Sequence, residues 1–155
     1  MTPKAPSPIP PDLWFEAHRA ELEVRWFELL RFPSIASESD HAADCDRCAD
    51  WLRKELEDMG FAAGVLQTPG RALVLAERPA DRPGLPSLLF YGHYDVQPVD
   101  PLSLWNQPDP FEPVTRDERV YARGAQDDKG QIFFALQALR PLREAGVPLP
   151  RIQVL

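Results

Sequence analysis

Residues 88–100 read LLFYGHYDVQPVD, and this stretch determines how the rest of the chain is interpreted. The run Leu88–Tyr91 is apolar without alternation, which predicts a central strand in a sheet that helices cover on both faces. Gly92 interrupts the run, and His93 and Asp95 follow with one residue between them. Because side chains at i and i+2 of an extended segment point to the same side, the imidazole and the carboxylate should project together.

The end of a strand is a favourable position for such a pair, because open α/β sheets bind ligands outside the carboxyl ends of their strands. A histidine beside a carboxylate is either oriented for base catalysis or is a metal ligand with a carboxylate partner. Histidine and aspartate also occur together on ordinary protein surfaces, so this pair alone does not indicate a function.

A second cluster lies in residues 121–131, YARGAQDDKGQ, where Asp127 and Asp128 stand side by side before a predicted helix. Adjacent carboxylates repel each other. A helix N-cap would explain Asp128 but not Asp127 as well. A divalent cation would offset the repulsion and hold a carboxylate together with the imidazole of His93. Nitrogen and oxygen ligands of this kind suit zinc or manganese better than calcium or magnesium.

The remaining pattern alternates helices and strands, which predicts the α/β class. Pro11 and Asp12 predict the start of the first helix, with Asp12 as its N-cap. Pro141 should loosen the last turn of the third helix. The expected helices are 13–32, 41–59 and 130–144, and the expected strands are 61–68, 71–78, 87–92 and 151–155, with a short hairpin within 116–124 at a sheet edge.

Composition limits the remaining function classes. The 155 residues suffice for one domain with a real core, and a net charge of −7 argues against a nucleic-acid surface. Neither a membrane-spanning run nor the apolar centre of a signal peptide is found, so we expect a cytoplasmic protein without membrane partners. Residues 1–11 are rich in proline and are expected to be disordered, leaving 12–155 as the folded domain.

Two other features receive structural interpretations. Cys45 and Cys48 form a C-x-x-C pair within a helical pattern and lack a second ligand pair, so we interpret them as reduced helix residues rather than a zinc or redox motif. Lys129 is expected to be solvated or paired locally.

Several segments in order carry a family resemblance. FPSIAS, LLFYGHYDVQPVDPLSLW, PFEPV and YARGAQDDKGQ together resemble the dinuclear zinc exopeptidases. That family includes carnosine-type dipeptidases, bacterial glutamate carboxypeptidase, aminoacylase and succinyl-diaminopimelate desuccinylase, and the form GHYDVQP…DDKG is most similar to the dipeptidase branch. The resemblance covers residues 13–155. It implies the N-terminal portion of a three-layer α/β/α catalytic domain, truncated within a strand.

The resemblance also implies roles for particular residues. His93 would bind one zinc, Asp127 would bridge two, and Asp95 would orient His93 through a hydrogen bond. The peptide bond between Asp127 and Asp128 would be cis. Glu118 and Ala122 depart from the family pattern, which commonly has glycine at both positions, but neither is a ligand.

The implied activity is hydrolysis of a small peptide or an N-acyl amino acid by water activated between two zinc ions, with manganese or cobalt as alternative metals. The complete enzyme would be a homodimer. In the family the general-base glutamate and the other ligands follow the point that corresponds to Leu155, so the isolated chain is expected to be inactive. Two alternatives stay open: a non-enzymatic binding or assembly module built on the half-fold, and a single-metal hydrolase completed by another subunit.

Overall fold

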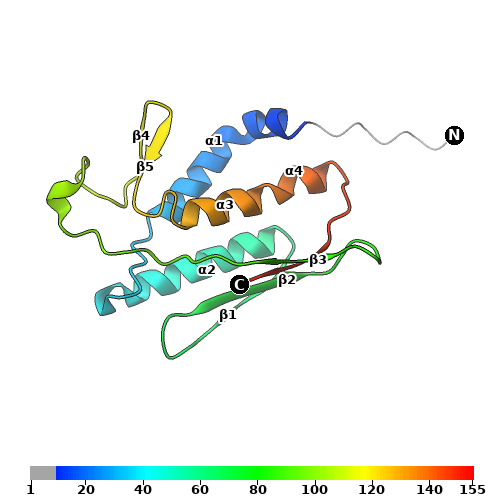
Figure 1. Ribbon diagram of the computed structural model, residues 1–155, viewed down its shortest axis with the longest axis horizontal. Coiled ribbons are helices and arrows are strands. Elements are labelled where there is room, and N and C mark those ends of the chain that lie inside the picture. The colour runs from blue at the N-terminus through cyan, green and yellow to red at the C-terminus, as the bar shows by residue number, and fades with distance from the viewer. Residues whose placement is uncertain (1–9) are drawn as a thin grey trace.

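The computed structural model describes residues 10–155 (Figure 1). Disorder was predicted for residues 1–11. Residues 1–9 lie outside the described part, so the structure tests this prediction only at Pro10 and Pro11. Pro11 is already the first residue of a helix. Within this part of the chain, no helix is both long enough and apolar enough to cross a membrane.

The first helix, α1, spans Pro11–Leu30. Proline is well suited to the first helical position, because its missing N–H would have no partner there. The N-cap position is Pro10, so the prediction of Asp12 as the cap is wrong. Asp12 instead lies in the first turn, where its negative charge interacts favourably with the helix dipole.

A short 3₁₀ turn, η1 (Ser39–His41), leads into α2, which spans Ala42–Asp58. Gly60 ends this helix as predicted, with φ of +84° and a hydrogen bond from the Phe61 N–H to the Leu56 carbonyl (3.0 Å). Cys45 and Cys48 lie within α2, and both are buried and free.

The main sheet has four strands in the order β1-β2-β6-β3. Neighbouring strands are antiparallel from β1 to β6, and β6 pairs with β3 in parallel. Because β3 and β6 run in the same direction, their carboxyl ends meet at one edge of the sheet. The strand bounds are β1 Ala62–Leu66, β2 Leu73–Arg78, β3 Ser87–Phe90 and β6 Arg151–Val154.

The α/β class is confirmed, but β3 is not the central strand that its apolar run predicted. In the described part of the chain β3 is the last strand of the sheet, and Leu89 is 65% exposed. The helices lie on one side of the sheet, with α2 directly against β1 and β2 (Figure 1). Leu66, Leu73 and Leu75 on the opposite face are exposed.

The predicted hairpin consists of β4 (Val114–Arg116) and β5 (Arg119–Tyr121). Within residues 10–155 these strands pair only with each other, so the expectation that they extend the edge of a larger sheet is wrong. The turn residues Asp117 and Glu118 have φ of 49° and 59°, which is the left-handed backbone of a type I′ turn. This geometry explains why glycine is common where Glu118 stands.

The third predicted helix is divided into α3 (Lys129–Gln137) and α4 (Leu139–Glu144). The division at Ala138 follows from Pro141, whose ring lacks an N–H and clashes with the carbonyl four residues earlier, at Gln137. The proline effect predicted from the sequence is therefore present, although it acts in the middle of the segment rather than in its last turn.

One buried carboxylate links helices α1, α2, α3 and α4. Glu55 on α2 is 1% exposed, and its Oε1 accepts hydrogen bonds from Gln137 on α3 (2.8 Å) and Arg140 on α4 (2.9 Å). Its other oxygen pairs with Arg25 on α1. A buried charge is tolerated when it is paired and hydrogen-bonded, so this network depends on all of its members.

We expect Glu55→Ala to lower the free energy of unfolding by about 3 kcal/mol, because the substitution breaks a buried ion pair. The lower end of the usual range applies because Arg25 and Arg140 keep 32% and 25% of their side chains exposed. The control is Glu57→Ala, which removes a solvent-exposed partner of Arg53 and should change stability by within about 0.5 kcal/mol. Urea unfolding measures both, and equal effects would contradict the assignment.

Candidate metal centre

The loop after β3 and the start of α3 bring the predicted ligands together. His93 Nε2 lies 3.2 Å from Asp127 Oδ1, although the residues are 34 positions apart. The side chains are 44% and 79% exposed, so both residues are open to solvent. An imidazole nitrogen and a carboxylate oxygen at this separation can converge on one cation.

Asp95 contacts the other side of the imidazole. His93 Nδ1 lies 3.2 Å from Asp95 Oδ1 and 3.1 Å from the Asp95 carbonyl oxygen. Burial of the ring acts to lower the pKa of His93, but the Asp95 hydrogen bond and the three nearby carboxylates outweigh it, so this pKa is raised. The contact with Asp95 directs Nε2 toward Asp127.

Asp128 has a role that the sequence did not reveal. The Asp127–Asp128 peptide bond is cis, as the resemblance predicted. Asp128 occupies the N-cap position of α3 without making a side-chain cap hydrogen bond. Its Oδ2 instead accepts a hydrogen bond from the backbone N–H of His93 (3.1 Å). The two neighbouring carboxylates therefore serve different partners, the imidazole and the backbone of the same histidine.

Gly92 permits this close approach of the two segments. A Cβ atom at this position would lie 2.6 Å from Ile132 Cγ1 and 3.0 Å from Asp128 Oδ2. Any side chain at residue 92 would therefore separate the β3 loop from α3. Close approach of two segments is one of the situations that require glycine.

Lys129 contradicts the expectation from the sequence. It was expected to be solvated or paired locally, but it is fully buried. Its Nζ donates a hydrogen bond of 2.6 Å to the carbonyl oxygen of Phe32, which is 97 positions away. Burial lowers the pKa of Lys129. No signal in the sequence distinguished this lysine from a surface lysine at a helix start.

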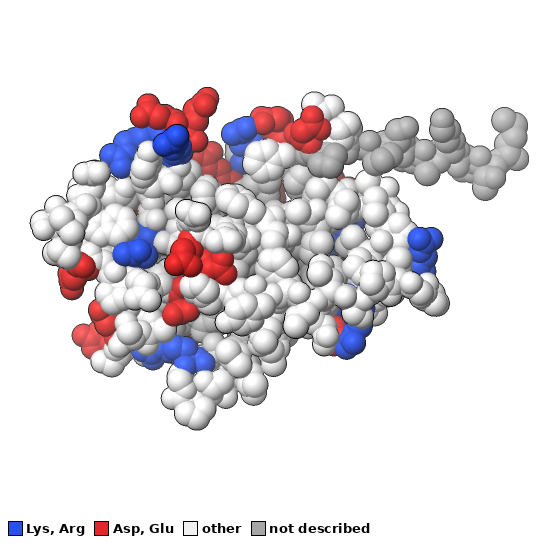
Figure 2. All heavy atoms as spheres, viewed as in Figure 1, with Lys and Arg blue, Asp and Glu red and all other residues white. Residues whose placement is uncertain are grey.

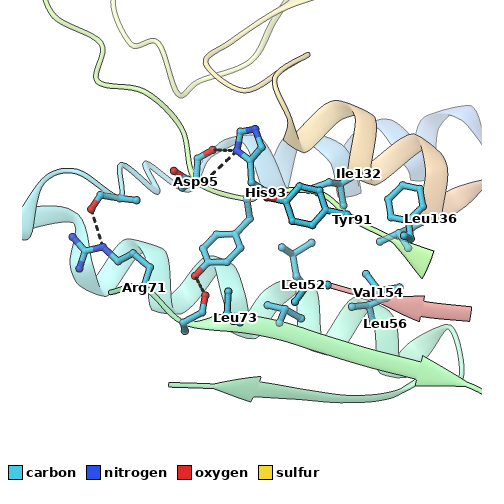
Figure 3. A pocket seen from close by; sticks show the side chains of 17 residues that line it. Leu52, Leu56, Arg71, Leu73, Tyr91, His93, Asp95, Ile132, Leu136 and Val154 are labelled. Atoms are coloured by element: carbon cyan, nitrogen blue, oxygen red, sulfur yellow. Dashed lines mark hydrogen bonds and ion pairs between the residues drawn. The ribbon is translucent and has the colours of Figure 1, made fainter. Parts of the chain in front are cut away.

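A cavity of about 310 Å³ adjoins the histidine, between the sheet and helices α2 and α3 (Figure 3). Its walls are mostly apolar and include Leu52, Ile132 and Val154, while His93 and Asp95 lie at one end. The end of β6 lies at the same hollow, because the Leu155 carbonyl accepts a hydrogen bond from Gly92 N–H (3.1 Å).

The described part of the chain supplies an incomplete ligand set. Residues 10–155 contain no group of three or more His, Cys, Asp and Glu side chains arranged to hold a metal ion. A catalytic zinc site normally uses three protein ligands and keeps a further position open. Acidic side chains gather on the face shown in Figure 2, over the region where α3 begins in Figure 1.

An imidazole and a carboxylate at the strand-end edge of an α/β sheet define a candidate site of the metallohydrolase type. Comparison with known proteins supports this class: residues 89–155 match the model of peptidase family M20/M25/M40. The resemblance inferred from the sequence is thereby confirmed, and the chain is related to these metallopeptidases.

Two relatives and one solved structure illustrate the similarity. A cysteinylglycine-S-conjugate dipeptidase of Corynebacterium striatum is 34% identical over 77% of this chain and 26% of its own length. A succinyl-diaminopimelate desuccinylase of Delftia acidovorans is 33% identical over 82% of this chain and 32% of its own length. The crystal structure of human carnosine dipeptidase 1 superposes with a TM-score of 0.81 at 25% identity, covering 96% of this chain and 34% of that one. The chain thus spans about a third or less of each protein.

We expect Gly92→Ala to destabilise the protein by about 1–3 kcal/mol, because the added methyl group overlaps Ile132 and Asp128. The matched control is Gly64→Ala on β1, where an added Cβ has no neighbour within 4 Å and should leave stability unchanged or slightly higher. Urea unfolding of both variants measures the difference. Equal stability of the two would show that the β3 loop and α3 separate without cost.

Proposed function

We propose that this chain supplies part of the active site of a zinc-dependent peptidase that hydrolyses dipeptides or related amide bonds, including those of N-acyl amino acids. The observation that carries the proposal is the 3.2 Å contact between His93 Nε2 and Asp127 Oδ1 across two separate segments. The relatives named dipeptidase and desuccinylase support the substrate class. Cytoplasmic location and a homodimeric complete enzyme belong to the same proposal and rest on sequence features and the resemblance.

In this proposal the chain's residues have distinct tasks. Asp95 accepts a hydrogen bond from His93 Nδ1–H, which leaves the lone pair of Nε2 free for a cation. Asp127 offers two oxygens and can bridge two cations. Asp128 holds the backbone of His93 in place.

The donor set fits zinc, because imidazole nitrogen and carboxylate oxygen are both zinc ligands, and manganese or cobalt could use the same donors. Bound zinc would supply a water molecule of lowered pKa and polarise the substrate carbonyl. The described residues contain no group of three or more side chains arranged to hold a metal ion, and the resemblance implies that the general-base glutamate lies outside residues 10–155. We therefore propose that residues outside this chain supply them, entering beside His93 where the end of β6 borders the cavity.

Zinc binding tests the assigned ligands. We expect His93→Ala and Asp127→Asn each to weaken zinc affinity by at least about tenfold. Each removes a donor atom, and even the loss of a residue that only hydrogen-bonds to a ligand lowers metal affinity by about tenfold or more. His41→Ala is the matched control, because His41 pairs with Asp44 at the start of α2. Isothermal titration measures the affinities. If the wild-type chain and His93→Ala bind zinc equally well, the assignment of His93 fails.

Activity tests the completeness of the site. We expect the 155-residue chain with zinc or manganese to show no turnover on a panel of dipeptides and N-acyl amino acids, because two ligands without a base do not assemble the reaction centre. A form of the protein extended beyond Leu155 should hydrolyse at least one of them and lose this activity in His93→Ala. Binding without hydrolysis by the extended form would favour the non-enzymatic alternative. Metal-dependent turnover by the short chain would overturn the expectation of inactivity.

A further inference from the structure

Lys129 is fully buried, although nothing in the neighbouring sequence accounts for a buried lysine at this position. In the part of the chain that the structure describes, no carboxylate lies within ion-pair distance of its ammonium group, which donates a hydrogen bond to the Phe32 carbonyl. Removing an ammonium group from water is costly unless it is well paired. The aliphatic stem packs against Gly124, where an added Cβ would lie 3.3 Å from Lys129 Cδ.

The segment that receives this hydrogen bond also holds the histidine loop. Ser34 is fully buried, and its Oγ donates a hydrogen bond of 2.7 Å to the carbonyl of Tyr94, the residue between His93 and Asp95. The Ser34 carbonyl accepts a hydrogen bond from Val96 N–H (3.0 Å). Ile35 and Val96 add a parallel bridge.

Residues 32–35 are therefore bonded to both segments that carry the candidate ligands. One end holds α3 through Lys129, two residues after Asp127, and the other end holds the loop that carries His93. We propose that residues 32–35 act as a brace that sets the separation between His93 and Asp127, with Lys129 and Ser34 as positioning residues for the metal ligands. This inference rests on the proposed function where it concerns metal affinity, but the brace itself does not require a metal.

A purely structural role and a positioning role of Lys129 predict different metal affinities for Lys129→Met. Methionine keeps an unbranched apolar stem and removes the buried charge, so stability should stay the same or rise. If Lys129 positions the α3 segment, however, the loss of its hydrogen bond frees Asp127 relative to His93. Metal affinity should then fall while stability does not.

The first experiment measures zinc affinity and the urea midpoint of the metal-free protein for Lys129→Met. The matched control is Lys54→Met on α2, whose side chain is 63% exposed. We expect the Lys129 variant to bind zinc about tenfold more weakly, the size of effect that supporting partners of ligands have, with an unchanged or higher midpoint. The control should match the wild type in both. Unchanged zinc affinity in Lys129→Met, whatever its midpoint, would overturn the positioning role.

The second experiment needs no metal and uses backbone amide NMR shifts. Lys129→Met should move the amide resonances of residues 93–96 through residues 32–35, and Lys54→Met should not. Ser34→Ala removes one hydroxyl, and its effect should pass the other way, from residues 32–35 to α3, where it should move the amide resonances of Gly130 and Ile132. This variant tests the brace if Lys129→Met does not fold.

These outcomes separate the two proposals. Unmoved resonances at 93–96 in Lys129→Met and at 130 and 132 in Ser34→Ala would overturn the brace even if the wild type binds zinc. Coupled resonances in a protein that binds no zinc would leave the brace standing and reject the proposed function instead.

Discussion

The close approach of the β3 loop to the first turn of α3 is the constraint on which the site depends. Gly92 leaves room for Ile132 and for the carboxylate of Asp128, and that carboxylate binds the His93 backbone. Only because these segments touch can His93 Nε2 and Asp127 Oδ1 lie 3.2 Å apart. The sheet contributes by placing the carboxyl ends of the parallel strands β3 and β6 at the same edge.

The candidate ligands could be predicted from the sequence because each cluster is formed by residues close together in the chain. His93 and Asp95 are separated by one residue in an extended segment, and Asp127 and Asp128 form an unusual acidic pair, so both clusters were visible without a structure. The prediction that both clusters share one place relied on strand-end geometry, and the 3.2 Å contact agrees with it. Helix ends such as Gly60 were predictable for the same reason, since a left-handed backbone strongly favours glycine.

The features that the sequence did not reveal all depend on long-range partners. The buried Lys129 donates a hydrogen bond to Phe32, 97 positions away, and Asp128 accepts one from the backbone of His93 rather than capping its own helix. The predicted central position of β3 was wrong. An apolar run indicates that a strand can be covered on both faces, but it does not show that the described residues cover it. Leu89 is apolar and still 65% exposed. Local pattern therefore identified the candidate ligands but not the long-range partners of the residues beside them.

Three carboxylates and one imidazole set the electrostatics of the candidate site. Asp95, Asp127 and Asp128 surround one imidazole and raise its pKa against the opposing effect of burial. A raised histidine pKa stabilises the fold at pH values below the unfolded pKa, and this contribution is lost as pH rises through the folded pKa.

Above that pH the three carboxylates face a neutral ring, and their mutual repulsion is no longer offset by the imidazolium. A divalent cation bound to the free Nε2 would replace the missing positive charge in that range. The same carboxylates that raise the pKa of His93 would attract a cation to Nε2, so in the proposed site a proton and a metal ion would compete for one nitrogen atom.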